Sequence, residues 1–391
     1  MLQPVFLGDD IFGLFRVSPV STSFMLFQEV LMASEPKTPL LFSPLKIRDL
    51  TFRNRIFVSP MCQYSAQDGI PTDWHLVHLG SRAVGGAALV MAEATAVSPV
   101  GRISPADTGL WSQPQVEGFR RITHFIKSQG AIPAVQLAHA GRKASTSPPW
   151  LGGKPLSEKE GGWPVLAPSA VPFASHHPSP KAMDEIDMGQ LISAFETAAH
   201  HSLQAGFEVV ELHMAHGYLL HEFLSPLCNQ RSDHYGGSLE NRMRLPLLIA
   251  ERVRNIWHKH LPVFVRISAT DWAEGGWDLA QSVSFCRELK KLGIDLIDVS
   301  SGGMVPHAKI PVGPGFQVPF AKSIREESQI PCGAVGLITK AKQAEDILQS
   351  GSSDAVFLAR EFLRDPYFPF HAAKELGADL PWPNQYERAK D

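Results

Sequence analysis

Eight short apolar runs, spread along the chain from Leu41 onward, constrain the fold more than any other feature of this sequence. The stretches between them carry helical periodicity, and this alternation is typical of βα units that build a parallel sheet. Near-continuous apolarity is what strands buried on both faces require. We therefore expect an α/β fold, a (β/α)8 TIM barrel formed as a single domain by residues 37–391. The eight runs cover residues 55–60, 88–92, 132–137, 209–212, 263–267, 296–299, 332–335 and 355–358.

Two of the helices are clear in the pattern. Apolar residues follow the 3.6-residue repeat over 188–203 behind Asp187 as a candidate N-cap, and again over 238–259 behind the cap Ser238. The segment 141–185 does not follow the alternation of apolar runs and helical stretches, because it is rich in Pro, Gly, Ser and His. It is too long for an ordinary βα loop, so we expect an excursion over the barrel mouth after the third strand.

Composition and charge limit the class of protein. The net charge is −3 and no Lys/Arg-rich block occurs, so nothing indicates a nucleic-acid or anionic-membrane partner. No run approaches 18 apolar residues, so no transmembrane helix is expected. Residues 1–36 have neither a basic n-region nor a clean cleavage site, and we expect a poorly ordered N-terminal extension there.

The four cysteines, Cys62, Cys228, Cys286 and Cys332, are far apart and form no C-x-x-C pair. Neither a disulfide framework nor a structural zinc site is indicated. This usage fits a reducing cytoplasm, which is the expected location.

The sharpest local motif is H-x-x-H-G-Y, with His213, His216 and Tyr218 just past the fourth apolar run. Two imidazoles three residues apart on a turn can aim at one oxygen and polarise a carbonyl or nitro group. Tyr218 could then supply a proton. Two alternatives stay open: ordinary packing, or a metal pair of a metal-dependent TIM-barrel hydrolase. No carboxylate or Cys with ligand spacing stands beside the pair, so no metal ligand is assigned.

The last two runs end in residues suited to phosphate. Gly336 follows the seventh run and Arg360 the eighth, where TIM barrels frequently bind phosphate; the alternative for Arg360 is an exposed salt bridge. No G-x-G-x-x-G follows a run, so a nicotinamide would be a transient reactant.

Three polar residues near the runs also fit a ligand. Arg266 interrupts an apolar run, so a buried negative partner or ligand is expected, and a reduced flavin anion would suit. Gln136 offers a donor and an acceptor to a planar heterocycle. Cys62 has no base in its motif, so by itself it is more typical of inert packing.

Together, these residues resemble the old yellow enzyme family, and specifically its thermophilic-like class, which includes xenobiotic reductases. The resemblance covers residues 39–388. The matching motifs are NRIFVSPMCQYSA, EATAV, QLAHAGRK, ELHMAHGYLLHEFLSPLCNQRSDHYGGSLENR, RISATD, GAVGLIT and QYER.

The resemblance implies non-covalently bound FMN, with NADPH or NADH as a transient reductant. It assigns the first FMN-contact stretch to Ser59, Pro60, Met61 and Cys62, further isoalloxazine contacts to Ala94, Gln136 and Arg266, and the phosphate grip to Gly336, Ala359 and Arg360. Ala359 departs from the usual Gly at its position, and the added methyl bears on FMN affinity.

The resemblance also implies roles in catalysis. His213 and His216 match the pair that binds the activating oxygen of the substrate, and Tyr218 matches the proton donor. Cys62 matches a thiol that tunes the flavin potential, and Tyr64 a hydroxyl on the substrate side.

Arg388 matches an arginine that reaches a neighbouring subunit's active site. A homodimer or homotetramer is implied.

The function implied is an FMN-dependent ene-reductase of the NADPH dehydrogenase type. Hydride would pass from the nicotinamide through FMN to the C=C bond of an α,β-unsaturated carbonyl, with nitro compounds as further acceptors. The metal-dependent hydrolase using His213 and His216 remains the alternative, and a non-catalytic flavin-binding barrel is a third reading.

Overall fold

The computed structural model of the protein describes residues 38–390, and those from Pro39 onward belong to one compact unit. The expectation of a poorly ordered extension over residues 1–36 lies outside the described residues. Among the described helices, none is both long enough and apolar enough to cross a membrane.

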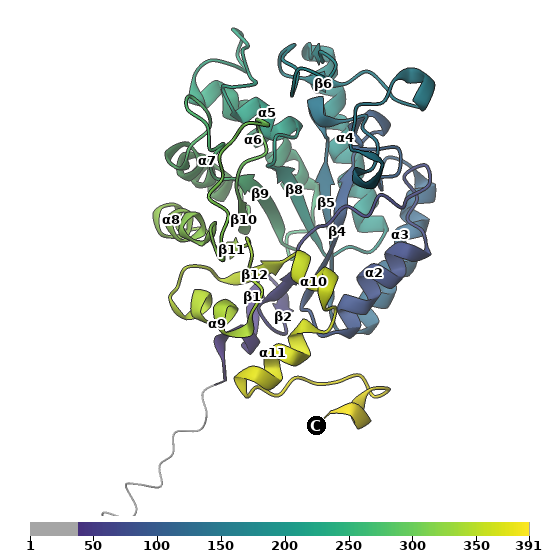
Figure 1. Ribbon diagram of the computed structural model, residues 1–391, viewed down its shortest axis with the longest axis vertical. Coiled ribbons are helices and arrows are strands. Elements are labelled where there is room, and N and C mark those ends of the chain that lie inside the picture. Colours follow the sequence, from purple (N-terminus) through teal and green to yellow (C-terminus); the bar gives the residue numbers. More distant parts are fainter. Residues whose placement is uncertain (1–37, 391) are drawn as a thin grey trace, which may run out of the picture. The chain divides into compact units, whose positions relative to one another are not determined.

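Eight parallel strands close into a barrel, so the predicted fold is confirmed (Figure 1). Every predicted run lies on one of these strands, and the residues of all eight are buried. Around the barrel they are β3 (Ile56–Val58), β4 (Leu89–Ala96), β5 (Ile132–Ala138), β8 (Val209–Met214), β9 (Val263–Ser268), β10 (Leu296–Ser300), β11 (Cys332–Ala334) and β12 (Ala355–Leu358), which returns to β3.

An antiparallel hairpin closes the barrel where the strands begin. It is formed by β1 (Leu45–Ile47) and β2 (Leu50–Phe52), which leads directly into β3. The ring of Phe52 lies 4.9 Å from that of Phe57, which in turn meets Phe357 edge to face at 5.3 Å. Aromatic rings therefore fill the interior at the amino end, so the opposite end is left for chemistry.

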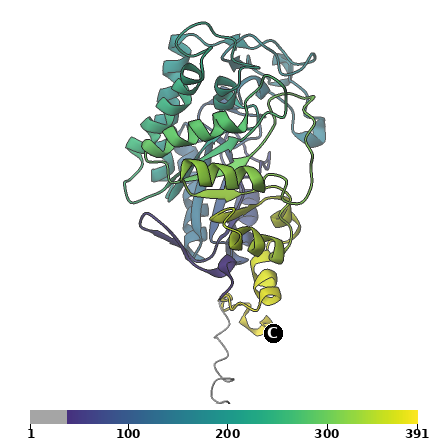
Figure 2. The ribbon, with the colours of Figure 1, turned by 90° about the vertical axis from the view of Figure 1, so that its left-hand side faces the viewer.

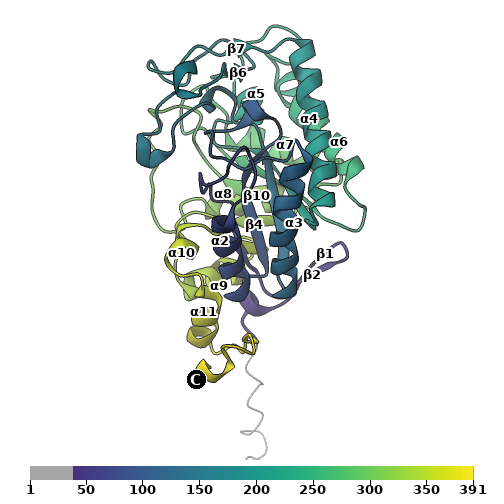
Figure 3. The same ribbon diagram turned by 90° about the vertical axis from the view of Figure 1, so that its right-hand side faces the viewer.

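The helices cover the outside of the barrel, as the two turned views show (Figures 2 and 3). They are α2 (Asp73–Val84), α3 (Gln113–Ser128), α4 (Glu185–Gln204), α5 (Leu219–Leu224), α6 (Leu239–Ile256), α7 (Leu279–Lys291), α8 (Val318–Ser328), α9 (Ala341–Gln349), α10 (Arg360–Arg364) and α11 (Phe368–Leu376). Short 3-10 turns are η1 (Leu40–Phe42), η2 (Pro99–Gly101), η3 (Gly141–Lys143), η4 (Pro149–Leu151), η5 (Glu158–Glu160) and η6 (Glu387–Ala389).

The start of α4 differs from the prediction. The N-cap is Asp184, whose side chain accepts a hydrogen bond from the backbone N–H of Asp187 at 2.9 Å. The backbone N–H of Asp184 in turn donates to the side chain of Asp187 at 3.0 Å. This reciprocal pair makes Asp187 the third helical residue, so the prediction of Asp187 as cap was wrong. The cap predicted at Ser238 is confirmed, although α6 ends at Ile256 rather than at residue 259.

The predicted excursion between β5 and α4 is confirmed. It carries η3, η4, η5 and two paired short strands, β6 (Leu166–Ala167) and β7 (Lys181–Ala182). In Figure 1 it rises above the barrel at the end opposite to the β1–β2 hairpin. It therefore borders the carboxyl ends of the strands, where a barrel of this kind places its chemistry.

Candidate active site

The predicted site residues gather at one end of the barrel, in its strands or just past their carboxyl ends. Arg388 is the exception. By strand, the others are Ser59, Pro60, Met61, Cys62 and Tyr64 after β3, Ala94 in β4, Gln136 in β5, His213 in β8 with His216 and Tyr218 after it, Arg266 in β9, Gly336 after β11, and Ala359 and Arg360 after β12.

The two histidines of the motif lie together. His213 is buried in β8 and His216 follows on a turn, with ring centroids 5.2 Å apart and planes 85° to each other. His216 is anchored twice: its N–H donates to Ser268 Oγ at 2.9 Å, and its Nε2 lies 2.7 Å from Ser300 Oγ. The backbone of His216 has φ +60°, and such a conformation persists only where the surroundings hold it. The pair is therefore held in place by neighbouring strand ends.

Burial, together with the Arg266 charge, lowers the pKa of both histidines well below the usual value. Both imidazoles are therefore neutral at physiological pH, and each has one N–H donor and one acceptor nitrogen. Among the described residues, the buried Nδ1 of His213 has no hydrogen-bond partner. The pair can thus donate to a ligand oxygen without the cost of a buried cation.

Tyr218 completes the motif, with its ring 5.0 Å from that of His213 at 78°. Burial raises the pKa of Tyr218 well above its usual value, so the hydroxyl keeps its proton. Lys143, from the loop after β5, lies 5.1 Å from the centre of the Tyr218 ring and donates to the carbonyls of His216 at 2.8 Å and Gly303 at 3.1 Å. One ammonium thus joins the loops after β5, β8 and β10.

Cys62 and Tyr64 lie on the loop after β3, which is held in place by residues of β4 and α2. The N–H of Gln63 donates to Glu93 Oε2 at 2.7 Å, and Glu93 Oε1 lies 2.8 Å from His75 Nε2. Burial raises the pKa of Cys62 well above its usual value, so this sulfur is a neutral thiol rather than a thiolate. Burial likewise raises the pKa of Tyr64, which stays protonated.

Strand β4 runs past the predicted end at residue 92, and an irregularity there explains Glu93. Pairing with β5 shifts register between Ala92 and Ala94, and then resumes with Ala94 opposite Gln136. Such a bulge re-aims a side chain. Glu93 is the extra residue, and it supports the Cys62 loop.

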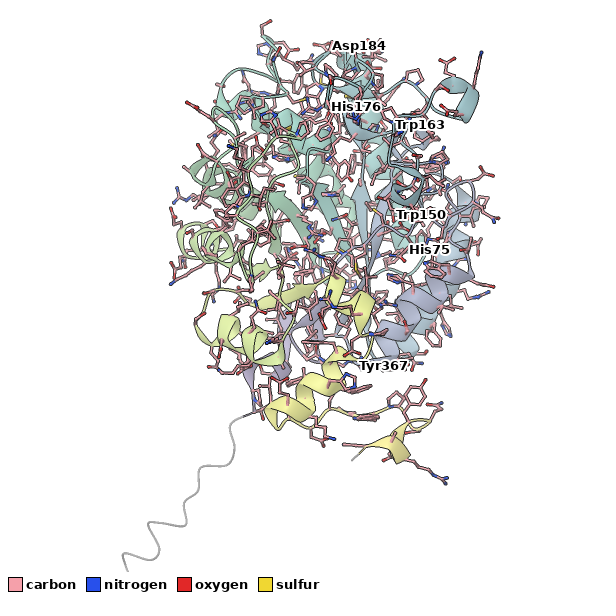
Figure 4. All side chains as sticks on the ribbon, viewed as in Figure 1. His75, Trp150, Trp163, His176, Asp184 and Tyr367 are labelled. Atoms are coloured by element: carbon pink, nitrogen blue, oxygen red, sulfur yellow. The ribbon has the colours of Figure 1, made fainter. Side chains whose placement is uncertain are left out.

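The excursion brings an aromatic residue to the same side. Trp150 meets Tyr64 edge to face at 5.7 Å while remaining 65% exposed. Figure 4 labels Trp150, which belongs to η4 of the excursion. The aromatic face of the site beside Tyr64 therefore opens to solvent.

A cluster of buried polar groups lies inside the barrel. Arg266 Nη1 donates to Ser59 Oγ at 3.1 Å, and Arg266 Nε lies 3.3 Å from Asp298 Oδ2, so the negative partner expected for Arg266 is Asp298. Gln136 Nε2 donates to Glu211 Oε1 at 2.8 Å. Burial raises the pKa of Asp298 to about 6 and raises that of Glu211 further above its usual value. Asp298 forms the ion pair with the Arg266 guanidinium. Glu211 is bonded to Gln136 and is affected by Arg266 only through its charge.

A cavity of about 200 Å³ is lined by the predicted phosphate residues Gly336, Ala359 and Arg360. Gly336 has φ +120°, and a Cβ there would lie 2.9 Å from Gln317 Nε2. The side chain of Arg360 is exposed and makes no hydrogen bond or ion pair with any residue from 38 to 390. Ser300 also lines this cavity, so it extends towards His216.

Arg388 is not brought to this site. It lies in η6, in the tail that follows α11, at the opposite end of the barrel from the excursion (Figure 1). Its side chain is exposed. A role in a neighbouring subunit remains a prediction.

Sequence reasoning missed four groups that the structure places in the site or directly behind it: Lys143, Glu211, Asp298 and the Glu93–His75 pair. Glu211 and Asp298 carry the same signal that identified Arg266, a charged residue inside an apolar strand.

The chain matches the NADH:flavin oxidoreductase / NADH oxidase family over residues 40–379. It belongs to this family. Among curated relatives, it is 49% identical to the NADPH dehydrogenase of Geobacillus sp. (strain WCH70), over 89% of this chain and 98% of the relative. It is 47% identical to the NADPH dehydrogenase of Bacillus subtilis (strain 168), with the same coverage.

Solved structures of the family agree. Morphinone reductase superposes with a TM-score of 0.73 at 26% identity, covering 90% of this chain and 93% of that one. The old yellow enzyme homologue from Zymomonas mobilis gives 0.71 at 28% identity, covering 88% and 94%. The resemblance to old yellow enzymes is thus confirmed.

Family membership makes the protein a flavin oxidoreductase, so the predicted enzyme class is confirmed and the hydrolase alternative is set aside. That alternative also needed further ligands around the histidines, and no three His, Cys, Asp or Glu side chains within residues 38–390 gather as a metal site.

The residues present fit a flavin phosphate. Arg360 lines the cavity with a guanidinium that has no partner among residues 38–390, and a Cβ on Gly336 would occupy the space beside Gln317. An arginine fork of this kind binds phosphate oxygens. Gln136 and Arg266 lie buried in β5 and β9, with polar groups suited to a heterocyclic ring.

Proposed function

We propose that the protein is an FMN-dependent ene-reductase that uses NADPH or NADH to reduce the C=C bond of α,β-unsaturated carbonyl compounds, with nitro compounds as further acceptors. The observation that carries the proposal is the neutral pair His213 and His216, of which His216 contacts Ser300 in the wall of the same cavity that Arg360 lines. NADPH is the favoured reductant, because the relatives at 47–49% identity are NADPH dehydrogenases.

Bound FMN would supply hydride transfer between the nicotinamide and the acceptor. The histidines would donate hydrogen bonds to the acceptor's carbonyl or nitro oxygen, where negative charge develops as the β-carbon gains hydride. Because burial keeps both imidazoles neutral, they polarise the oxygen without protonating it.

The proton for the α-carbon would come from Tyr218, whose raised pKa keeps its hydroxyl protonated. Tyr64 would line the acceptor side, and Cys62 would lie beside the flavin as a neutral thiol that tunes its potential. Lys143 fixes the backbone of His216 and thereby the aim of the pair.

The proposal includes a homo-oligomer, with Arg388 reaching the site of a neighbouring subunit. Its support is the exposed position of Arg388 on a tail remote from its own site. Analytical ultracentrifugation of wild-type protein and Arg388→Ala, with enone kinetics on both, tests this part. A monomer with full activity contradicts it.

The function is tested by anaerobic turnover of cyclohexenone with NADPH. We expect cyclohexanone in one-to-one ratio with NADPH consumed, and parallel double-reciprocal plots, because both reactants use one site in turn. NADPH oxidation without a saturated product contradicts the proposal.

A further inference from the structure

Glu211 is a buried carboxyl to which the chemistry above gives no task. It lies in β8 with no exposed surface, directly opposite Gln136 of β5 in the strand register. Its Oε1 accepts from Gln136 Nε2 at 2.8 Å, while its Oε2 has no hydrogen-bond partner among the described residues. Burying a carboxyl group costs free energy, so Glu211 is expected to have a role at this position.

The contact fixes which way the Gln136 amide faces. An amide has a donor –NH2 and an acceptor oxygen, and the –NH2 of Gln136 is the group that faces Glu211 Oε1. Gln136 Oε1 accepts no hydrogen bond from residues 38–390. The amide therefore offers a ligand an acceptor and not a donor.

The pyrimidine edge of a flavin has two carbonyl oxygens with one N–H, the N3–H, between them. An acceptor on the protein can pair only with that N–H, whereas an amide turned the other way would donate to a carbonyl. The direction of the Gln136 amide thus decides which flavin atom it can bind.

We propose that Glu211 is a positioning residue for the cofactor: it holds the –NH2 of Gln136 so that Gln136 Oε1 accepts from the N3–H of the flavin. This inference rests on the proposed function, because it needs a flavin in the site. Glu211 itself does not touch the cofactor and acts on it only through Gln136.

The test compares FMN with N3-methyl-FMN, which lacks the N3–H, by fluorescence titration of flavin-free protein. Wild-type protein should bind N3-methyl-FMN about 10-fold or more weakly, as for the loss of a buried hydrogen bond. In Glu211→Met the amide is free to turn, so this preference should fall at least about fivefold, mainly through weaker FMN binding. The steric effect of the N3 methyl group acts in both proteins, so it cancels when the affinity ratios of wild-type protein and Glu211→Met are compared.

Two variants separate positioning from general damage. Glu211→Gln keeps an acceptor oxygen for Gln136 and should restore the wild-type preference. Glu222 is an equally buried glutamate with one bonded and one unbonded oxygen, and its Oε1 accepts from the N–H of Arg142 at 2.9 Å. Glu222→Met should therefore leave the preference unchanged.

Each outcome decides the question. An equal preference in wild-type protein and Glu211→Met overturns the inference and leaves the proposed function standing. Wild-type protein that binds neither flavin overturns both. If Glu211→Met does not fold, wild-type protein and Glu211→Gln decide: no preference in wild-type protein, or its loss in Glu211→Gln, overturns the inference.

Discussion

The two ends of the site differ in how firmly the rest of the protein holds the side chains that would meet a ligand. At the histidine end, formed by His213, His216 and Tyr218, His216 is bound through its ring, its N–H and its carbonyl. At the phosphate end, formed by Gly336, Ala359 and Arg360, the guanidinium of Arg360 is exposed and pairs with no residue from 38 to 390.

This contrast indicates that the histidine end serves the reaction and the phosphate end serves cofactor binding. Groups that must meet a developing charge are fixed before the ligand arrives, which lowers the cost of reorganisation during the reaction. Groups that only hold a cofactor can be left for the cofactor to satisfy. Substitutions at the histidine end should change rates, and those at the phosphate end should change FMN affinity.

The largest effect is expected for His213→Ala. Loss of one donor to the acceptor oxygen should slow reoxidation of the reduced enzyme by cyclohexenone about 100-fold or more, with little change in FMN affinity. Stopped-flow measurement of both half-reactions checks this, with the exposed His258→Ala as control. An unchanged reoxidation rate would remove the histidine pair from the mechanism.

The converse is expected for Arg360→Met. Losing a charge-assisted bond to phosphate should weaken FMN binding about 10- to 100-fold. Riboflavin, which has no phosphate, should bind equally to wild-type and variant protein. Arg364→Met, in the same helix α10 but paired with Glu361, is the matched control. Equal losses for FMN and riboflavin would place Arg360 away from the phosphate.

A smaller effect is expected for Gly336→Ala. The new Cβ would need φ +120° and would approach Gln317, so FMN binding should weaken about 10-fold. Gly351→Ala is the control, since Gly351 also has positive φ, +69°, but nothing lies within 4 Å of its Cβ position. Both should lose thermal stability, and only Gly336→Ala should lose FMN affinity.

The smallest effect is expected for Ala359→Gly. Ala359 has a negative φ of −109°, so this position is not in the left-handed region that favours glycine, and the methyl group in the cavity is what the substitution removes. Its removal should tighten FMN binding by no more than about threefold, less than one hydrogen bond. Isothermal titration checks this, and weaker binding would show that the methyl group packs usefully against the cofactor.

The parts that could be predicted from sequence are those that depend on local pattern. Each barrel strand is a contiguous apolar run, so all eight were found, and the His213–Tyr218 motif is contiguous too. The start of α4 was misplaced by one turn, because Asp184 and Asp187 can each cap a helix and only the reciprocal bond decides between them.

The groups that were missed depend on register between strands. Arg266 was expected to have a negative partner, but that partner is Asp298 because β9 and β10 pair with Arg266 opposite Asp298. Glu211 faces Gln136 for the same reason across β5 and β8. Lys143 meets the carbonyls of His216 and Gly303 only when three loops converge, which a linear pattern does not show.

The proposed ene-reductase function is tested most directly by an absorption spectrum of the purified protein, recorded before and after anaerobic addition of NADPH and then cyclohexenone. An FMN-dependent ene-reductase should show a flavin band that bleaches with NADPH and recovers fully with the enone. A protein that remains colourless after incubation with FMN, or a reduced flavin that the enone does not reoxidise, would contradict the proposed function.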